Sequence, residues 1–300
     1  MSVGSAALAL PSMRRTRWLL ARLWSHRGRY LVGAVCVLLC AFALGPIVLA
    51  VLASVKPPAE SAAVPPTYVP HSLSLASYQR LWNFQLGLPT YLLNSLGTAC
   101  MTIVFALGLT LPAGYALARF PLPYKEVLFV FLLLELIIPY QALLTPIFLL
   151  FTQLKLTNTL LGLAIIHTAI QLPFSLYVMR NSFEAVPREL DEAAVIDGAN
   201  SWQVLVRVFV PAGIPAIITV ALFAFITSWN EFLGALVMMN RGASFTLPLI
   251  LAVNLATTSL GGTDWGILQA GVTISMIPCV LFYALLQRYY VSGLTSGAVK

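Results

Sequence analysis

The longest charged, amphipathic stretch of this apolar sequence is residues 189–215, which reads ELDEAAVIDGANSWQVLVRVFVPAGIP. It has no nucleophile beside a base and no set of metal ligands, so these residue types do not predict catalysis. Its carboxylates flank small residues, which allow the backbone of another protein to approach closely. Acidic groups around such a surface can pair with basic groups of a partner. The alternative is an ordinary polar loop between two membrane segments. The charged residues are Glu189, Asp191, Glu192, Asp197 and Arg207.

A short helix is expected to hold the first half of this stretch. Pro187 suits the first turn of a helix. Leu190, Ala193 and Ala194 then follow at helical spacing and form one narrow stripe. Gly198 can end the helix in a left-handed conformation. The sequence therefore predicts a helix that ends at a tight turn.

A second helix is expected directly after that turn. Asn200 or Ser201 can cap its first turn. Its apolar side chains form a wider stripe, and two prolines then begin the next membrane segment. The stripe consists of Trp202, Leu205, Val206 and Phe209, and the prolines are Pro211 and Pro215.

The composition of the chain is that of a membrane protein. Hydrophobic residues make up 59% of the 300 residues, charged residues only 9%, and the mean hydropathy is +0.89. A soluble domain carries about 25% charged residues. The net charge of +7 does not predict nucleic-acid binding, because the basic residues lie around apolar segments. We expect contact with membrane lipid and none with nucleic acid.

Six apolar segments reach the ~20 residues that a helical span needs. We therefore predict an all-α membrane protein, with a basic tail over 1–30 and a transmembrane domain over 31–300. The first twelve residues are expected to be dispensable, because Met13 with Arg14 and Arg15 makes a more ordinary start. Residues 72–82 suggest a surface helix, and 245–256 is too short to span. The predicted spans are 31–55, 90–118, 127–154, 158–179, 214–239 and 265–287.

The distribution of basic residues predicts the orientation of these spans. With both termini in the cytosol, thirteen Lys and Arg residues lie on the cytosolic side. Only Lys56, Arg80, Lys155 and Arg241 lie on the other side. Since basic residues accumulate on the cytoplasmic side of a membrane, this bias places residues 189–215 in the cytosol.

The same stretch resembles the signature loop of the permease subunits of bacterial and archaeal ABC importers. That pattern is E-A-A, three residues, G, nine residues, then I-x-L-P. Here Glu192, Ala193 and Ala194 precede Gly198, and Val208-Phe209-Val210-Pro211 completes it with Val at the Ile and Leu positions. The resemblance implies the type I importer permease fold, with a coupling helix between spans four and five. The residues it assigns to ATPase coupling are Glu192, Ala193, Ala194, Asp197, Gly198, Ala199 and Pro211.

Further segments resemble carbohydrate-uptake permeases, especially the maltose-type second permease. They include LNSLGTA (93–99), AGYALARF (113–120), LIIPYQALLTPIF (136–148) and ITSWNEFLGAL (226–236). DWGILQAGV (264–272) and the tail 285–300 are also similar. The resemblance implies a multi-pass protein of the bacterial or archaeal plasma membrane that imports a sugar or a sugar-like solute. It also implies a second homologous permease, an ATPase dimer and an extracytoplasmic solute-binding protein as partners.

Two carboxylates, Glu135 and Glu231, lie within predicted spans. Charge at the centre of a spanning helix costs roughly 3 kcal/mol, so such groups usually face the bundle interior or a water-filled cavity. Glu231 and Asn230 could meet sugar hydroxyls, with Trp229 as a stacking surface; Tyr140 and Gln141 could line the same path. The alternative is a hydrogen bond to another span. His167 is expected to be an interhelical donor, because no acidic relay accompanies it in the sequence.

Several patterns are absent from the sequence. It has no G-x-x-x-x-G-K-[ST] loop for phosphates, no HExxH and no nucleophile elbow. We therefore expect a non-catalytic subunit that binds no cofactor or metal, with ATP-Mg bound by the separate ATPase. The alternatives are a permease for another small solute, an ATP-independent secondary transporter and a membrane-embedded enzyme. The sequence shows neither inverted repeats nor a catalytic cluster that would favour the last two.

Overall fold

A computed structural model describes residues 12–63, 65–253 and 264–296, and the secondary structure of these residues is entirely helical. The chain divides into two units, Met1–Leu52 and Ala53–Lys300. The prediction that 1–12 is dispensable falls almost wholly outside the described residues.

The first unit contains most of α1 (Ser12–Ser54), one helix of 43 residues. Its apolar part, Gly28–Ser54, has a mean hydropathy of 2.9 over its most apolar window and is long enough to cross a membrane. The basic residues from Arg14 onward belong to the same helix as the first span. The predicted tail and first span are thus continuous in secondary structure.

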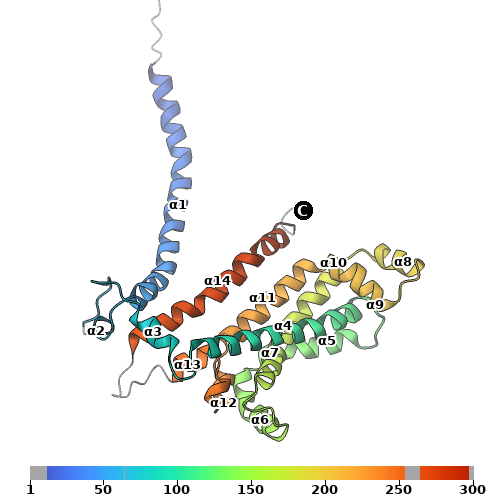
Figure 1. Ribbon diagram of the computed structural model, residues 1–300. Coiled ribbons are helices and arrows are strands. Elements are labelled where there is room, and N and C mark those ends of the chain that lie inside the picture. The colour runs from blue at the N-terminus through green and yellow to red at the C-terminus, as the bar shows by residue number, and fades with distance from the viewer. Residues whose placement is uncertain (1–11, 64, 254–263, 297–300) are drawn as a thin grey trace, which may run out of the picture. The chain divides into compact units, whose positions relative to one another are not determined.

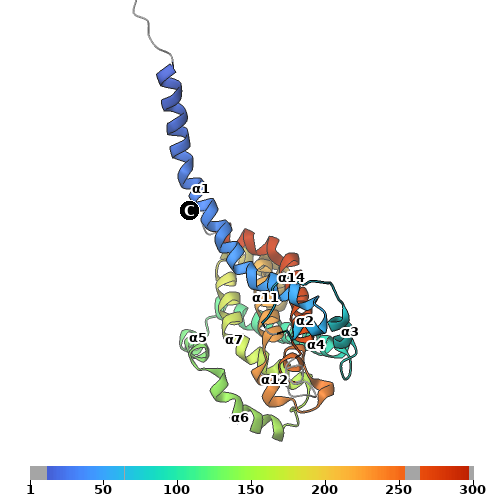
Figure 2. The same ribbon diagram turned by 90° about the vertical axis from the view of Figure 1, so that its left-hand side faces the viewer.

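Three long helices form the centre of the second unit. They are α4 (Leu88–Arg119), α7 (Leu160–Glu184) and α11 (Ile214–Asn230), and they pack against one another (Figures 1 and 2). The last helix, α14 (Trp265–Ser296), packs against α11. One buried cluster, which includes Trp229 and Leu247, lies near the start of α4, and another, which includes Phe209 and Phe183, lies near its end.

The third predicted span, 127–154, is not one helix. It consists of α5 (Lys125–Leu133), a 3-10 turn (Leu134–Ile137) and α6 (Tyr140–Gln153), and α6 is bent by 101° from the preceding helical segment. Proline disfavours helical geometry in the residue before it. Ile138, which precedes Pro139, is extended with ψ 121°. The break therefore lies where the sequence has its proline.

The fifth predicted span, 214–239, is likewise not one continuous helix. The helix α11 ends at Asn230, and Glu231 is extended with ψ 128° before α12 (Leu233–Met238). At its other end, α11 is bent by 80° from the segment that includes α10 (Val210–Ala212). Among the described residues, four helices are by themselves long and apolar enough to cross a membrane, and up to six spans result if each bent pair counts as one.

The remaining helices are short. The surface helix predicted within 72–82 is present as α3 (Ala76–Trp82), and α13 (Leu247–Val253) covers the described part of 245–256. The helix α2 (Pro58–Ser61) is the first short helix of the second unit, and a 3-10 turn covers Gly242–Ser244. The helices α8 (Arg188–Ile196) and α9 (Ser201–Val204) lie at the opposite end of α4 from α3 (Figure 1).

Candidate functional site

The two short helices predicted in residues 189–215 are present and are joined by a tight turn. Gly198 has φ +82°, as its predicted left-handed conformation requires. The amide of Ala199 donates to the carbonyl of Ala194 at 2.9 Å, and that of Gly198 donates to the carbonyl of Val195 at 3.0 Å. This pair of bonds satisfies the last carbonyls of α8 in the Schellman arrangement. The local prediction at Gly198 is therefore confirmed.

The second helix, α9, begins with reciprocal hydrogen bonds between Asn200 and Gln203. Each side-chain oxygen accepts the backbone N–H of the other residue at 2.9 Å, which makes a capping box. Asn200, and not Ser201, is thus the cap. A π-helical turn, Leu205–Phe209, then leads to α10.

The outer surface of this loop carries apolar side chains beside acids. We call this surface the docking patch. It consists of Leu190, Ala193, Val195, Ile196 and Trp202, all of which are exposed, with Ile196 at 85% and Trp202 at 66%. Glu189, Glu192 and Asp197 are exposed around it. A Cβ added at Gly198 would meet nothing within 4 Å, so this turn is open as well.

The inner surface of the loop packs on the bundle. Each of the two predicted apolar stripes is divided between the inner and the outer surface. In the first stripe, Ala194 is half-buried, and in the second, Leu205 and Phe209 are buried. The Phe209 ring contacts the rings of Tyr115 and Phe183 at 4.8 and 5.3 Å between centroids. Of the other residues assigned to coupling, Ala199 is half-buried and Pro211 is exposed.

Arg119, at the end of α4, holds the loop in place, and sequence reasoning did not find this role. Its Nη2 donates to the carbonyl oxygens of Phe183, at 3.0 Å, and of Val186. Its Nε lies 3.2 Å from Oδ2 of Asp191 in α8. Burial raises the pKa of the Asp191 carboxyl, and the charge of Arg119 opposes this rise. The one sequence signal was that Arg119 lies in the AGYALARF segment.

Arg180 connects two helices at the same end of the bundle. This residue is 7% exposed, and its guanidinium lies over the Phe129 ring at 4.2 Å. It donates to Glu126 in α5 at 2.6 Å and to Glu184 at 2.8 Å. It therefore connects α5 to the end of α7.

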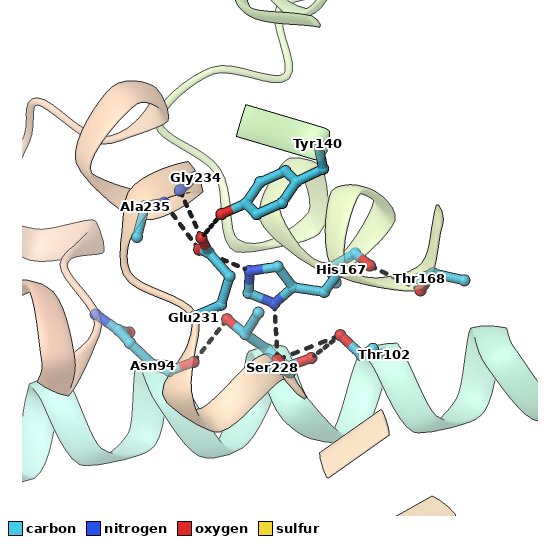
Figure 3. Close-up of polar contacts among 11 residues, drawn as sticks. Asn94, Thr102, Tyr140, His167, Thr168, Ser228, Glu231, Gly234 and Ala235 are labelled. Carbon is cyan, nitrogen blue, oxygen red and sulfur yellow. Dashed lines mark hydrogen bonds and ion pairs between the residues drawn. The ribbon is translucent and has the colours of Figure 1, made fainter. Parts of the chain in front are cut away.

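The second candidate region surrounds Glu231, at the break between α11 and α12 (Figure 3). Oε1 of Glu231 accepts the Tyr140 hydroxyl and, at 2.7 Å, the Gly234 amide. Oε2 accepts the Ala235 amide at 3.2 Å and lies 3.2 Å from Nε2 of His167. Glu231 is 9% exposed. All its acceptor positions face groups of this chain, so the structure does not bring the carboxylate to a free surface.

His167 makes the interhelical contacts expected of it, and an acid does lie beside it. It is fully buried in α7, and its Nδ1 lies 2.8 Å from the Ser228 hydroxyl in α11. Ser228 lies 3.4 Å from the hydroxyl of Thr102 in α4. Because an ionised carboxylate only accepts, Nε2 of His167 donates to Glu231. Nδ1 then accepts from Ser228 if the ring is neutral.

The other predicted wall residues differ in their exposure. Trp229 is 1% exposed, stacks on Phe225 and donates to the carbonyl of Ser275, so its ring is not an open stacking surface. Asn230 and Gln141 are exposed, Tyr140 is half-buried, and Glu135 is half-buried in a 3-10 turn. Asn230 lines a hollow of about 260 Å³ whose other lining residues are Trp229, Pro248, Leu251, Ala252, Leu268 and Ser275.

Comparisons with known proteins are consistent with this arrangement. Residues 110–296 match the family described as binding-protein-dependent transport system inner membrane component. The osmoprotective compounds uptake permease GgtD of Synechocystis sp. is 38% identical over 215 residues, 71% of each chain. The trehalose transport permease SugB of Mycobacterium tuberculosis is 34% identical over 77% of this chain and 84% of SugB.

A solved structure is similar over nearly the whole chain. It is a bacterial ABC transporter involved in the import of the acidic polysaccharide alginate. The TM-score is 0.77 at 25% identity, with 89% of this chain and 98% of the other covered. The two chains therefore share their overall architecture.

Proposed function

The chain belongs to the family of binding-protein-dependent transport system inner membrane components, and on that premise we propose that it forms half of the import path for a sugar or sugar-like solute. It is a multi-pass membrane protein and an ABC importer permease. Support for a sugar comes from relatives named for trehalose, diacetylchitobiose and sulfoquinovosyl glycerol. The relative named for osmoprotective compounds supports a second candidate, a small solute of another class.

The docking patch carries the proposal that this chain works with a separate ATPase. An apolar surface flanked by Glu189, Glu192 and Asp197 suits a groove with apolar walls and a basic rim. The ATPase would act as a dimer that binds ATP-Mg, and this chain would bind no cofactor. A second homologous permease would provide the other half of the path, and an extracytoplasmic binding protein would deliver the solute.

The proposed orientation places the docking patch and both termini in the cytosol. It is supported by the excess of basic residues at that end of the spans. The proposed solute path runs past the exposed amides of Asn230 and Gln141, which can donate to and accept from hydroxyl groups. Tyr140, Trp229 and Glu231 lie behind them and support this wall.

The experiment is reconstitution of the assembled importer in proteoliposomes. A candidate ATPase, second permease and binding protein sought among the neighbouring genes would be purified with this chain, and binding of radiolabelled trehalose and of glycine betaine by the binding protein would be compared. We expect sugar binding by the binding protein, and uptake only with ATP and all subunits present. Uptake without the ATPase would show a secondary transporter, and binding of glycine betaine alone would show the second class of solute.

A further inference from the structure

The Glu231 carboxylate lies where two chain breaks meet. Tyr140 is the first residue of α6, directly after the break in the third span, and Glu231 itself lies at the break after α11. The Glu231 carboxylate accepts the Tyr140 hydroxyl through Oε1 and lies beside His167 of α7 through Oε2. One side chain thus connects three segments that are far apart in the sequence (Figure 3).

The same carboxylate completes the start of α12. The first amides of a helix have no partner within it and need one from outside. Oε1 and Oε2 of Glu231 accept two of them, from Gly234 and Ala235. A Cβ at Gly234 would lie 3.0 Å from Oε2, so a residue without a side chain allows this approach.

We propose that Glu231 is a positioning residue for transport: its carboxylate pins the breaks of the third and fifth spans together and holds Asn230 at the hollow. The transport role rests on the proposed function, whereas the connection that Glu231 makes between the two breaks is a property of the chain itself. Each oxygen takes two donors, and a carboxylate has about four acceptor positions, so none remains for a solute hydroxyl.

An amide in place of the carboxylate separates this role from direct solute binding. The NH2 of Glu231→Gln replaces one oxygen and faces the amide of either Gly234 or Ala235, neither of which can accept. Tyr140 and His167 can adapt, because a hydroxyl can rotate and an imidazole can change tautomer. One backbone donor at the start of α12 is therefore left without a partner. A solute hydroxyl, by contrast, can bond to either side chain.

The test is hydrogen exchange of the full-length chain, assembled with its partner subunits in lipid nanodiscs without solute. We expect Glu231→Gln to accelerate exchange over 233–239 about tenfold or more, since a buried donor is left unpaired. Asn230→Ala is the matched control, because among the described residues the Asn230 side chain bonds the Ile226 carbonyl of its own helix and no group of α12, so exchange over 233–239 should stay unchanged. Unchanged exchange in Glu231→Gln would overturn the proposal.

A milder variant keeps the proposal testable if Glu231→Gln does not insert. Tyr140→Phe retains the ring and removes only the bond to Oε1, so exchange over 140–146 should rise about threefold while 233–239 stays protected. Equal protection of the first turn of α6 in Tyr140→Phe and in the parent would contradict the proposal that Glu231 holds the two breaks together.

Transport is measured as uptake of trehalose. Glu231→Gln should lower the maximal rate of uptake, and Asn230→Ala should raise KM. Failure of the parent to import any solute would contradict the proposed function and leave the exchange result standing.

Discussion

Arg119 and Asp191 lie 3.2 Å apart, Nε to Oδ2, and join the last turn of α4 to the helix that carries the docking patch. The Arg119 guanidinium also lies over the buried Phe209 ring, 5.0 Å from its centroid. The loop is therefore attached to the bundle by charge, by carbonyl contacts and by an aromatic ring. A force on the docking patch can be passed to α4 through these contacts.

Replacing Arg119 should uncouple the loop from the span. Arg119→Ala removes two carbonyl bonds and leaves Asp191 partly buried without its ion-pair partner, although the charge of Arg188 still acts on it. Hydrogen bonds to a charged group contribute about 1.5–3 kcal/mol, although partial exposure of Asp191 reduces the ionic part. We expect uptake and solute-stimulated ATP hydrolysis to fall about tenfold or more with normal membrane insertion. Both are measured in proteoliposomes.

Two controls separate the contacts of Arg119. Arg119→Lys keeps the charge but not the forked donors, so it should retain only part of the activity. Asp191→Asn leaves the carbonyl contacts intact and should have the mildest effect. Equal activity of all three variants and the parent would show that the loop needs no such attachment.

The local features of the docking loop were predictable because each depends on neighbouring residues. A glycine after a helical run predicts a left-handed end, and Asn200 three residues before Gln203 predicts a capping box. The division of each stripe between an inner and an outer surface was not predictable, because Ala194 and Phe209 face helices that lie elsewhere in the sequence.

A hydrogen bond from Glu231 to another span was one of the two alternatives, but its partners could not be identified for a similar reason. Its partners Tyr140 and His167 lie 91 and 64 residues away, so no spacing rule connects them. The sequence marked a carboxylate in an apolar segment but could not say what it bonds. Only one of the two breaks has a signal in the sequence. Pro139 marks the break in the third span, whereas the break after α11 falls at Glu231 and Phe232, neither of which is a helix-breaking residue type.

The orientation can be tested with single cysteines in a variant lacking Cys36, Cys40, Cys100 and Cys279. Ser72, four residues before α3, and Ser201, the first residue of α9, are both exposed, and α3 and α9 lie toward opposite ends of α4 (Figure 1). We expect Ser72→Cys to react with a membrane-impermeant maleimide in intact cells, and Ser201→Cys to react only after permeabilisation. External labelling of Ser201→Cys would reverse the proposed orientation.

The docking patch should lose its partner when an apolar side chain becomes charged. Ile196 is 85% exposed, so Ile196→Asp should not disturb the fold of this chain. An uncompensated charge in an apolar contact should lower co-purification of the ATPase about tenfold or more, since buried unpaired charges are costly. Leu73→Asp is the matched control, because Leu73 is 79% exposed on α3's side of the bundle. Full ATPase recovery with Ile196→Asp would place the contact elsewhere.

Substitutions at Gly198 distinguish backbone strain from close approach by the ATPase. At φ +82°, alanine is strained by about 1–2 kcal/mol, whereas asparagine tolerates this region better. Asparagine is also the larger side chain, and within this chain either would point into open space. If strain alone matters, Gly198→Ala should impair ATP-driven uptake more than Gly198→Asn.

If a partner surface covers this turn, the order should reverse. Gly198→Asn should then weaken ATPase co-purification more than Gly198→Ala, and Gly198→Asp, of equal size but negatively charged, should abolish solute-stimulated ATP hydrolysis. We expect this second order, because the carbonyls at the end of α8 are already satisfied by the amides of Gly198 and Ala199 and the turn is open. All variants should insert normally, since the spans are unchanged. Full ATPase binding and uptake by Gly198→Asp would mean that the loop only connects two spans.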